Sequence, residues 1–557
     1  MTVSAREAVR VPPSRGDAAL VPPGGRRPRN PFLTSPPVLL AGEAAVAFLA
    51  ALVLPLLARG LKLDPLDRIA QVSGLAAVQL RFALLGLLLL AVTVVAMRAR
   101  AGRHFSLVAR FASAGLAGLA SGFVAAGAVI ALLGTPWPMF GLNGDSGRIV
   151  EWAHAVVNGQ PSGSPVYPPA PLYTLGYYAE WFRGGNTAYA FKDLQILGAA
   201  AFGPLVYLSW RMLLSPVRAL AFGVLPAFAL IDAYKPYSQT VLVVLVPVLV
   251  ALVVELRRSG TAAWRPLLLK AAGFGALLGL LFLTYSGWYL WSAAGVLVAA
   301  LMYFPWRTGR AKGLVFAGVT GVAFLAVCGS YLLTMLTEGQ DTKDSNFRFD
   351  NLTDPAYFLM WRTDMPGKVG EWPLPGEFGG LDLFAVLMFV ALGAALWLGI
   401  RKPLVVVICC MFASAWVLRM YIASHMYETH TVQLYTRTNN QLLYCGLLLC
   451  ALVAHLVSLR LADRRAAGPA LGGLPGSHAA VVGTLFALLF LFGSVSSAMA
   501  DRYMPAKENS YRILPWVSHT VRKLDGTCPK FAPDGRCSKD GDQSWLTMIQ
   551  DPTASSH

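Results

Sequence analysis

Long apolar stretches separated by short polar segments are the main pattern of this chain. Val481–Ala500, for example, contains no charged residue. A helix of about 20 residues rises 1.5 Å per residue and so matches the roughly 30 Å hydrocarbon core of a bilayer. The fifth predicted span is short, and only a tight turn separates the seventh from the eighth. The pattern predicts thirteen membrane-spanning helices, at about residues 38–58, 76–97, 111–133, 188–213, 216–232, 239–256, 267–284, 287–305, 312–334, 381–400, 403–422, 438–459 and 479–500.

The composition excludes a soluble protein. Apolar residues make up 56% of the 557 positions and charged residues only 13%, against roughly 25% charged residues in ordinary soluble domains. Residues 1–37 are rich in Pro, Gly, Ser and Arg without an apolar period, which predicts a disordered arm. The expected fold class is therefore an all-α polytopic membrane protein, with residues 38–500 as the transmembrane domain.

The distribution of charge predicts the orientation. The net charge is +17, and most Arg and Lys residues lie in short segments between apolar runs, such as Arg98, Arg100 and Arg103. With a cytoplasmic N-terminus, every inner segment is basic, while the longer outer segments hold most of the acids, as the positive-inside rule requires. Membrane topology thus explains the charge better than nucleic-acid binding does. Thirteen spans in the plasma membrane place the C-terminal tail, 501–557, outside the cytoplasm.

Two cysteines lie in this polar tail. Cys528 and Cys537 are separated by a Pro- and Gly-containing segment. In an oxidising compartment a disulfide between them is the natural interpretation, with two free thiols as the alternative. A zinc site is less favoured, because two sulfurs without a nearby His supply too few ligands.

The first large outer segment, 134–187, is the most informative. It begins with the run GTPWPMFGLNGDSGRIVEWAHAVVNGQ. Apolar residues at helical spacing over 146–157 predict a helix in the membrane interface, with Asp145 near its N-terminus. Asp145 would be either a catalytic acid or base or only the N-cap of that helix. The stretch Tyr167–Tyr173 predicts a stiff, extended wall for a sugar, or else part of an interfacial aromatic belt.

Further polar groups lie in other outer segments. Lys235 follows the fifth span in IDAYKPYSQT, residues 335–380 form a long acidic segment, and 423–437 forms a dense one. Arg419 and Arg437 bracket the last of these on the outer side, where a phosphate ligand would explain them; snorkelling Arg is the alternative. The residues His425, Glu428 and His430 do not share one helical face, so a metal site is disfavoured. No cofactor is predicted, although a divalent cation is left open.

These pieces resemble a known group. A multi-span protein with an Asp in its first large outer loop is similar to the GT-C glycosyltransferases, which use polyprenyl-phosphate sugars. Within that group, GLNGDSG and the later HMYETHTVQLYTRTNNQLLYC resemble the actinobacterial arabinofuranosyltransferases that prime cell-wall galactan. The resemblance covers about residues 38–500. It implies a GT-C-like bundle and transfer of arabinofuranose from decaprenyl-phosphoryl-arabinose to galactan at the outer face. The tail departs from the family, which commonly has a larger globular domain there.

The predicted site follows from this chemistry. A lipid-phosphate donor holds its sugar at the membrane surface, the leaving phosphate needs cations, and the acceptor hydroxyl needs a base. We assign Asp145 as the base and Arg437, Arg419 and Lys235 as donor-phosphate ligands. Substrate-binding candidates are Asn143, Tyr167, Tyr173, His425, Glu428, His430 and Tyr435.

Two other classes of function are compatible with the spans. A transporter or flippase of a lipid-linked saccharide would share the outer aromatic residues and the phosphate-binding cations. Such a protein should carry ionisable residues in mid-span, whereas here the polar groups gather at one surface. A non-catalytic scaffold in wall assembly would leave the polar outer cluster unexplained. A glycosyltransferase with a cell-wall glycan acceptor is therefore the favoured function.

Overall fold

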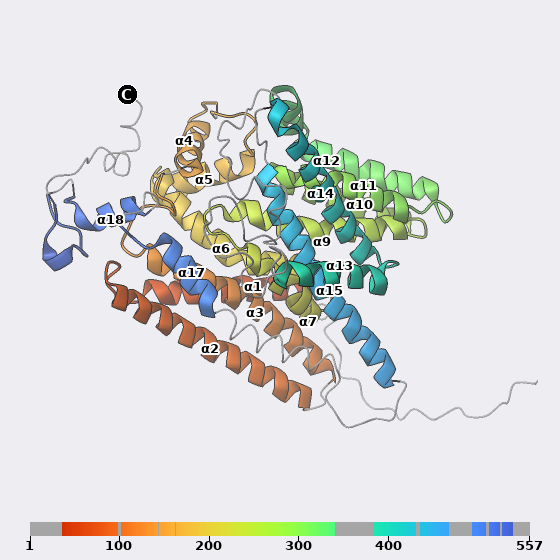
Figure 1. The fold of residues 1–557 in the computed structure, drawn as a ribbon, viewed down its shortest axis with the longest axis horizontal. Helices are drawn as coiled ribbons and strands as arrows, with labels where there is room; N and C mark the ends of the chain where they lie inside the picture. The colour runs from red at the N-terminus through yellow and green to blue at the C-terminus, as the bar shows by residue number, and fades with distance from the viewer. Residues whose placement is uncertain are drawn as a thin grey trace, which may run out of the picture. The chain divides into compact units, whose positions relative to one another are not determined.

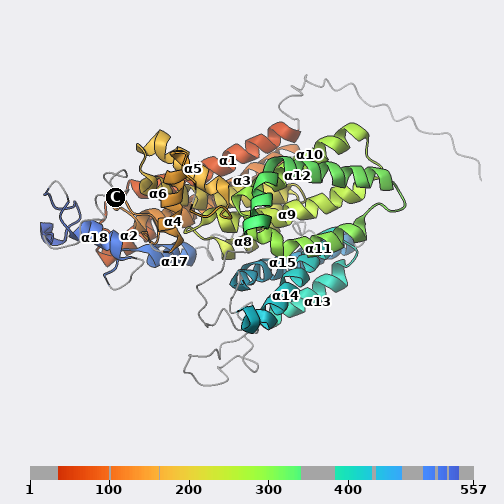
Figure 2. The same ribbon diagram turned by 90° about the horizontal axis from the view of Figure 1, so that it is seen from above.

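The computed structural model describes residues 36–98, 102–142, 144–161, 163–339, 383–429, 435–466, 493–507, 512–523 and 526–538. Within these ranges the protein is all-helical, and the only β-type pairing is a single bridge between Val521 and Ser538. Residues 36–42 group with the N-terminal segment, and the chain from Glu43 onward forms one unit. Figures 1 and 2 show the helices in two views.

Eight helices of the described chain are long and apolar enough to cross a membrane, as expected of a polytopic membrane protein. They are α1 (Pro36–Arg59), α2 (Arg68–Arg98), α3 (Gly102–Ala131), α9 (Pro236–Ser259), α10 (Trp264–Thr284), α12 (Arg310–Glu338), α14 (Pro403–Thr429) and α15 (Thr438–Ala466). The remaining α-helices of at least eight residues are α4 (Asp145–Val157), α5 (Pro169–Arg183), α6 (Thr187–Arg211), α11 (Gly287–Tyr303), α13 (Leu383–Gly399), α17 (Gly493–Tyr503) and α18 (Ile513–Thr520).

The fifth predicted span is not a regular helix. Residues 216–230 form a short α-helix α7 (Pro216–Ala219), a π-turn over Leu220–Val224, α8 (Leu225–Ala227) and a 3₁₀ turn over Phe228–Leu230. Pro226 lies within this stretch. Proline lacks the N–H that an α-helix needs, and its ring clashes with the preceding turn. The regular series of α-helical backbone hydrogen bonds is therefore interrupted here.

The other predicted spans fall on helices to different extents. Spans one to four and six to twelve each coincide with a helix, although α2 begins at Arg68 and α14 continues to Thr429. Of the thirteenth span only 493–500, in α17, belongs to the described chain, and the outer segment 340–380 lies outside it. The count of thirteen spans and the orientation remain predictions.

Small residues allow α3 to pack closely against three other helices. A Cβ atom on Gly118 or Gly122 would collide with the backbone of α1 at Ala47 and Ala51. Gly203 of α6 approaches α3 in the same way, and Gly127 of α3 approaches α17. Close backbone approach at small residues is a main source of packing between membrane helices. The Gly- and Ala-rich sequence of α3 therefore makes it the centre of its helix group.

A buried carboxylate ties α1 to α3 and α6. The side chain of Glu43 is fully buried. It is 2.7 Å from Arg211 and 3.3 Å from Arg110, and the Tyr207 hydroxyl donates a hydrogen bond to it over 2.8 Å. A buried charge is tolerated only when it is paired and hydrogen-bonded. This cluster therefore holds together the ends of three helices.

Two further groups of helices complete the arrangement. Helix α9 contacts α6, α10, α11 and α14. Helix α13 packs against α14 and α15 (Figures 1 and 2). Helices α4 and α5 pack on each other and on the first turns of α6, through apolar side chains such as Ile149, Leu172 and Phe191. The predicted helix is thus present as α4, packed against α5 and α6, and its place in the membrane interface remains a prediction.

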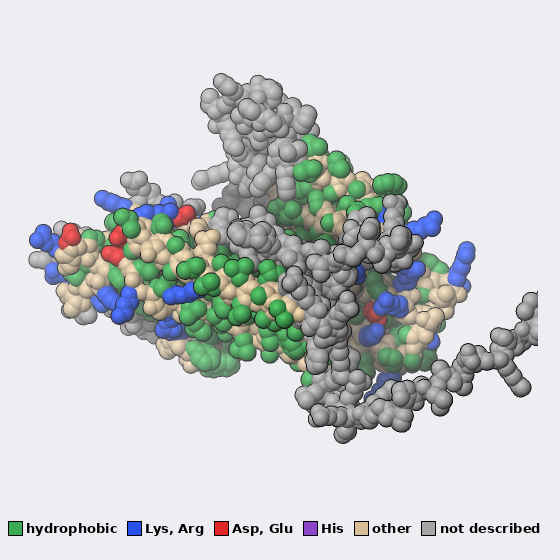
Figure 3. Space-filling view, turned by 90° about the horizontal axis from the view of Figure 1, so that it is seen from below, with side chains coloured by type: hydrophobic (Ala, Val, Ile, Leu, Met, Phe, Trp, Pro, Cys, Tyr) green, Lys and Arg blue, Asp and Glu red, His purple; other side chains and the backbone are tan. Residues whose placement is uncertain are grey.

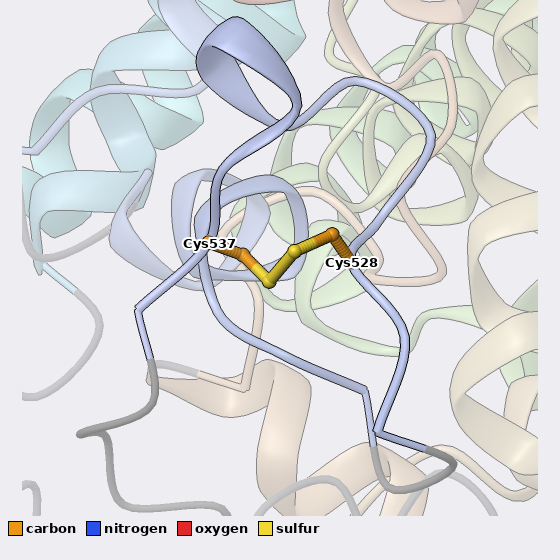
Figure 4. Close-up of a disulfide and its surroundings, with 2 residues drawn as sticks. All are labelled: Cys528 and Cys537. Carbon is orange, nitrogen blue, oxygen red and sulfur yellow. A yellow bond between two sulfur atoms is a disulfide. The ribbon is translucent and has the colours of Figure 1, made fainter.

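The C-terminal tail packs against the turn that follows α3. Cys528 and Cys537 are joined by a disulfide, with their Cα atoms 5.6 Å apart (Figure 4). The aromatic rings of Phe531 and of the buried His519 lie against Gly134, where a Cβ atom would meet both. Gly134 has a φ of +74°, which favours glycine. The tail thereby covers the start of the segment that leads to Asp145.

Candidate functional site

A strained turn precedes α4 and places Asp145 at the start of this helix. Phe140, Gly141 and Gly144 have φ values of 64°, 57° and 60°, a region that glycine adopts at little cost and Phe rarely adopts. Gln195 of α6 holds this turn, because the Met139 N–H donates to its Oε1 over 2.8 Å. The Gln195 amide in turn donates to the Tyr234 carbonyl over 2.9 Å. One side chain therefore connects the two loops that form the site.

Asp145 is not the N-cap of α4. The capping residue is Gly144, no side chain caps the helix, and Asp145 is its first residue. Its carboxylate forms an ion pair with the Lys235 ammonium. The Asp145 side chain is 44% exposed and the Lys235 side chain 19% exposed. The carboxylate is thus accessible to a substrate and is held in place by a cation from a distant segment.

Lys235 lies in the loop directly before α9. Asp232 stabilises this loop by accepting a 3.0 Å hydrogen bond from the Tyr234 N–H. Burial, with a smaller contribution from the nearby Arg437, lowers the pKa of Lys235 to about 7. An anion beside an ammonium group favours its charged form. Lys235 is therefore a cation whose charge depends on what the site contains.

Arg437 and several tyrosines complete the polar cluster. Arg437 ends a 3₁₀ turn before α15, and its guanidinium is 5.7 Å from the centre of the Tyr285 ring. The hydroxyls of Tyr167 and Tyr237 are hydrogen-bonded at 2.5 Å. Burial raises the pKa of Tyr167, so this hydroxyl remains protonated and can donate. We call Asp145, Lys235, Arg437, Tyr167, Tyr237 and Tyr285 the outer cluster.

An apolar groove of about 430 Å³ adjoins the outer cluster. Its walls come from α4, α5, α6, α9 and α10, and Tyr237 is one of its lining residues. The same Tyr237 hydrogen-bonds Tyr167 in the cluster. Polar atoms are few along the groove; its other lining residues include Pro171, Leu175, Leu194, Val244, Leu277 and Leu281. The site thus combines an apolar groove with a polar cluster, and Tyr237 belongs to both.

Arg419 has a different environment from Arg437. Its side chain is fully buried. It donates hydrogen bonds to Thr438 Oγ1 at 2.8 Å and to Asn439 Oδ1 at 2.6 Å, and it stacks 4.2 Å above the Tyr435 ring. Tyr435 is also fully buried. Arg419 therefore fixes the junction between Tyr435 and α15, and we leave both residues out of the proposed ligand contacts.

The segment 423–437 was predicted as a loop, and its first part is instead helical. His425, which is half-buried, and Glu428, which is exposed, lie in the last turns of α14. His425 Nδ1 is 2.7 Å from the Tyr421 carbonyl within that helix. The prediction was wrong because an apolar pattern marks only the apolar part of a helix, and α14 continues through the polar residues that follow, to Thr429. In the described part of the chain no group of three His, Cys, Asp or Glu side chains could hold a metal ion.

Three other predicted residues are placed differently or lie beyond the structure. Asn143 and His430 lie outside the described residues. Tyr173 lies on α5, which begins at Pro169, so the predicted extended wall is a helix. Proline fits the first turn of a helix because its φ is already helical and no N–H is needed there. Tyr173 stacks on Tyr177, and Tyr177 stacks on Trp181. All three rings are at least 43% exposed.

The sequence-based site omitted Tyr237, Tyr285 and Gln195. Tyr237 stands two residues after Lys235 in IDAYKPYSQT, and Tyr285 begins the turn between α10 and α11. A search for aromatic residues beside outer cations would have found Tyr237, whereas Tyr285 has no cation near it in the sequence. Gln195 gives no such signal, because one polar residue in an apolar helix does not indicate its partners.

We found no match to this chain among models of known protein families or among curated protein sequences. The functional interpretation therefore depends on the residues themselves and on their geometry.

Proposed function

We propose that this protein is a membrane glycosyltransferase that uses a polyprenyl-phosphate sugar as its donor. The observation that carries the proposal is the position of Tyr237, which lines the apolar groove and also contacts the outer cluster. A ligand with an isoprenoid tail and a phosphorylated sugar needs this combination of apolar groove and polar cluster. The resemblance of the outer segments to arabinofuranosyltransferases suggests decaprenyl-phosphoryl-arabinose as the donor and galactan as the acceptor.

Two cations are available for the donor phosphate. Arg437 and Lys235 are close enough for Arg437 to lower the pKa of Lys235. Two neighbouring cations repel each other until an anion lies between them. Arginine in particular suits phosphate, because its planar group can donate two parallel hydrogen bonds. The same cations would stabilise the charge that develops on the departing phosphate.

Asp145 supplies the base for the acceptor. Its carboxylate takes the proton of an acceptor hydroxyl while the hydroxyl oxygen attacks the anomeric carbon of the donor sugar. The bond from that carbon to the phosphate oxygen breaks, and polyprenyl phosphate leaves with the electron pair. A single displacement of this kind inverts the anomeric centre and needs one carboxylate only.

The ion pair between Asp145 and Lys235 sets the order of two steps, donor binding and proton transfer to Asp145. Without a donor, the Lys235 ammonium is paired with the carboxylate and occupies it. A donor phosphate competes for the ammonium, and Asp145 becomes free to accept a proton. Donor binding would thereby activate the base only when the sugar is in place.

A donor panel tests the proposal. The purified full-length protein is incubated with decaprenyl-phosphate sugars and a galactan oligosaccharide, and mass spectrometry follows the released decaprenyl phosphate and the extended acceptor. We expect both products with the arabinofuranosyl donor, and their formation about 10²–10⁴-fold slower with Asp145→Asn. As a matched control, Glu180→Gln neutralises an exposed carboxylate of α5, outside the cluster, and should leave transfer unchanged.

The same assay separates the proposal from transport. Movement of a fluorescent donor across liposomes without any release of decaprenyl phosphate would identify a flippase and overturn the proposal. Transfer of a different sugar would keep the reaction class and correct the donor.

A further inference from the structure

A second cavity lies at the opposite ends of the helices, away from the outer cluster. It has a volume of about 1510 Å³, above the roughly 300–1,000 Å³ of pockets for small molecules. Its walls come from the last turns of α9 and α11, the first turns of α10, and the turns after α11 and α13. These turns belong to segments whose charges predict a cytoplasmic location.

The lining of this cavity is strongly basic. It contains six cations and one carboxylate: Arg257, Arg258, Lys270, Arg307, Arg401, Lys402 and Glu255. Glu255 is already paired, at 3.1 Å with Arg258 and at 2.5 Å with Lys270. Among the described residues, Arg307, Arg401 and Lys402 form no ion pair. Figure 3 shows Lys and Arg side chains gathered on the right of that view, where the ends of α10 and α11 lie in Figure 1.

Apolar and aromatic side chains line the same cavity between the cations. Phe274, Phe304 and Leu404 lie among the lining residues, and the ring of the exposed Trp306 contacts the Phe304 ring, with the ring centres 4.5 Å apart and the planes tilted by 51°. Arg257 lies 5.5 Å from the Tyr303 ring. Trp and Tyr with Arg and Lys are typical of the boundary between headgroups and acyl chains. Excess positive charge therefore meets an apolar wall at the depth of the lipid headgroups.

We propose that this cavity binds an anionic phospholipid. Basic pockets between transmembrane helices bind anionic headgroups, and the apolar wall would receive the first part of the acyl chains. The phosphate would lie among Arg307, Arg401 and Lys402, and the lipid would bridge the ends of the α9–α11 group and the α13–α14 turn. This site is independent of the glycosyltransferase proposal.

Lipid retention tests the site. Full-length protein is reconstituted in nanodiscs with equal phosphatidylglycerol and phosphatidylcholine, re-extracted into detergent, and the retained lipid is quantified by mass spectrometry. We expect preferential retention of phosphatidylglycerol and about a tenfold loss in Arg307→Gln/Arg401→Gln. The control Arg265→Gln/Arg310→Gln removes two exposed cations that do not line the cavity and should retain the lipid. Equal retention of both lipids, or an equal loss in both double variants, would overturn the proposal.

A second measurement uses the unaltered protein. A phosphatidylglycerol with a photoactivatable acyl chain should crosslink to peptides containing residues 302–308 or 401–404. Excess glycerol phosphate should not displace it, because the free headgroup lacks the apolar part. Crosslinks confined to other segments, or displacement by glycerol phosphate, would contradict a lipid site.

Discussion

Asp145 and Lys235 form an ion pair although 90 positions separate them in the sequence. Asp145 begins α4 and Lys235 directly precedes α9, so the pair joins two segments that the sequence predicts on the outer side. The ion pair orients Asp145, the proposed base. It also gives Lys235, the proposed phosphate ligand, a carboxylate partner that a donor phosphate would replace.

The charge of Lys235 should make donor binding depend on pH. The pKa of Lys235 is lowered to about 7, mainly by burial. The ammonium is therefore present below about pH 7 and is lost as the pH rises through that value. We expect a phosphodiester donor analogue, which does not itself titrate in this range, to bind more weakly as the pH increases from about 6 to about 9. Isothermal titration calorimetry across this range measures the effect.

Lys235→Arg is the matched variant for this titration. Arginine keeps its proton throughout the range, so the affinity of the variant should be nearly constant with pH. An identical pH dependence in both proteins would show that another group is responsible.

Arg437→Lys should weaken donor binding more than catalysis. Lysine keeps the charge but loses the planar group that donates two parallel hydrogen bonds to phosphate. We expect KM for the donor to rise about tenfold with a smaller change in kcat. Arg183→Lys changes an exposed arginine that is paired with Asp193 and should leave both constants unaltered. A fall in kcat at unchanged KM would move Arg437 from donor binding to the chemical step.

Gly122 should not tolerate even a methyl group. A Cβ atom at Gly122 would collide with the Ala51 carbonyl of α1, whereas a Cβ atom at Gly321 of α12 meets nothing within 4 Å. We expect Gly122→Ala to destabilise the protein by about 1–3 kcal/mol, while Gly321→Ala is neutral or slightly stabilising. Thermal unfolding in detergent compares the two. Equal midpoints would mean that α1 and α3 do not pack as described.

Removing the tail disulfide should loosen the tail. Cys528→Ser/Cys537→Ser frees a short loop whose closure contributes about 2–3 kcal/mol. Phe531 lies within that loop and packs on Gly134, so we expect faster proteolysis between residues 520 and 540. Cys409→Ser/Cys410→Ser changes two cysteines that are not disulfide-bonded and is the control. Unchanged protease resistance would show that packing alone holds the tail.

Many of the helices could be predicted because long apolar runs directly mark helices that are able to cross a membrane, whether or not their side chains are buried in the protein. The helix over 146–157 was expected from its spacing, and it is present as α4. The broken stretch near Pro226 and the extension of α14 to Thr429 were missed. In both places the hydropathy pattern no longer indicates the backbone conformation, since one stretch is apolar but irregular and the other is polar but helical.

Individual residues of the candidate site were predicted from the sequence, but their arrangement in space was not. Asp145, Lys235 and Arg437 were each selected from local sequence, yet nothing local indicates that Lys235 pairs with Asp145. In the sequence, Arg419 and Arg437 look alike, because each is a cation near aromatic residues in a segment predicted to be outside. Only packing separates them, because Arg419 is enclosed by Thr438, Asn439 and Tyr435. The membrane orientation remains a prediction from the charges of the loops.

The most direct test of the account is the single-turnover rate of Asp145→Asn with a saturating arabinofuranosyl donor and a galactan acceptor. Asparagine keeps the shape of the side chain but cannot accept the proton of the acceptor hydroxyl. Donor binding is measured separately, and Glu180→Gln is assayed in parallel. We predict a rate that is about 10²–10⁴-fold lower, while the protein remains monodisperse and still binds the donor. A rate close to that of the unaltered protein would contradict the assignment of Asp145 as the base.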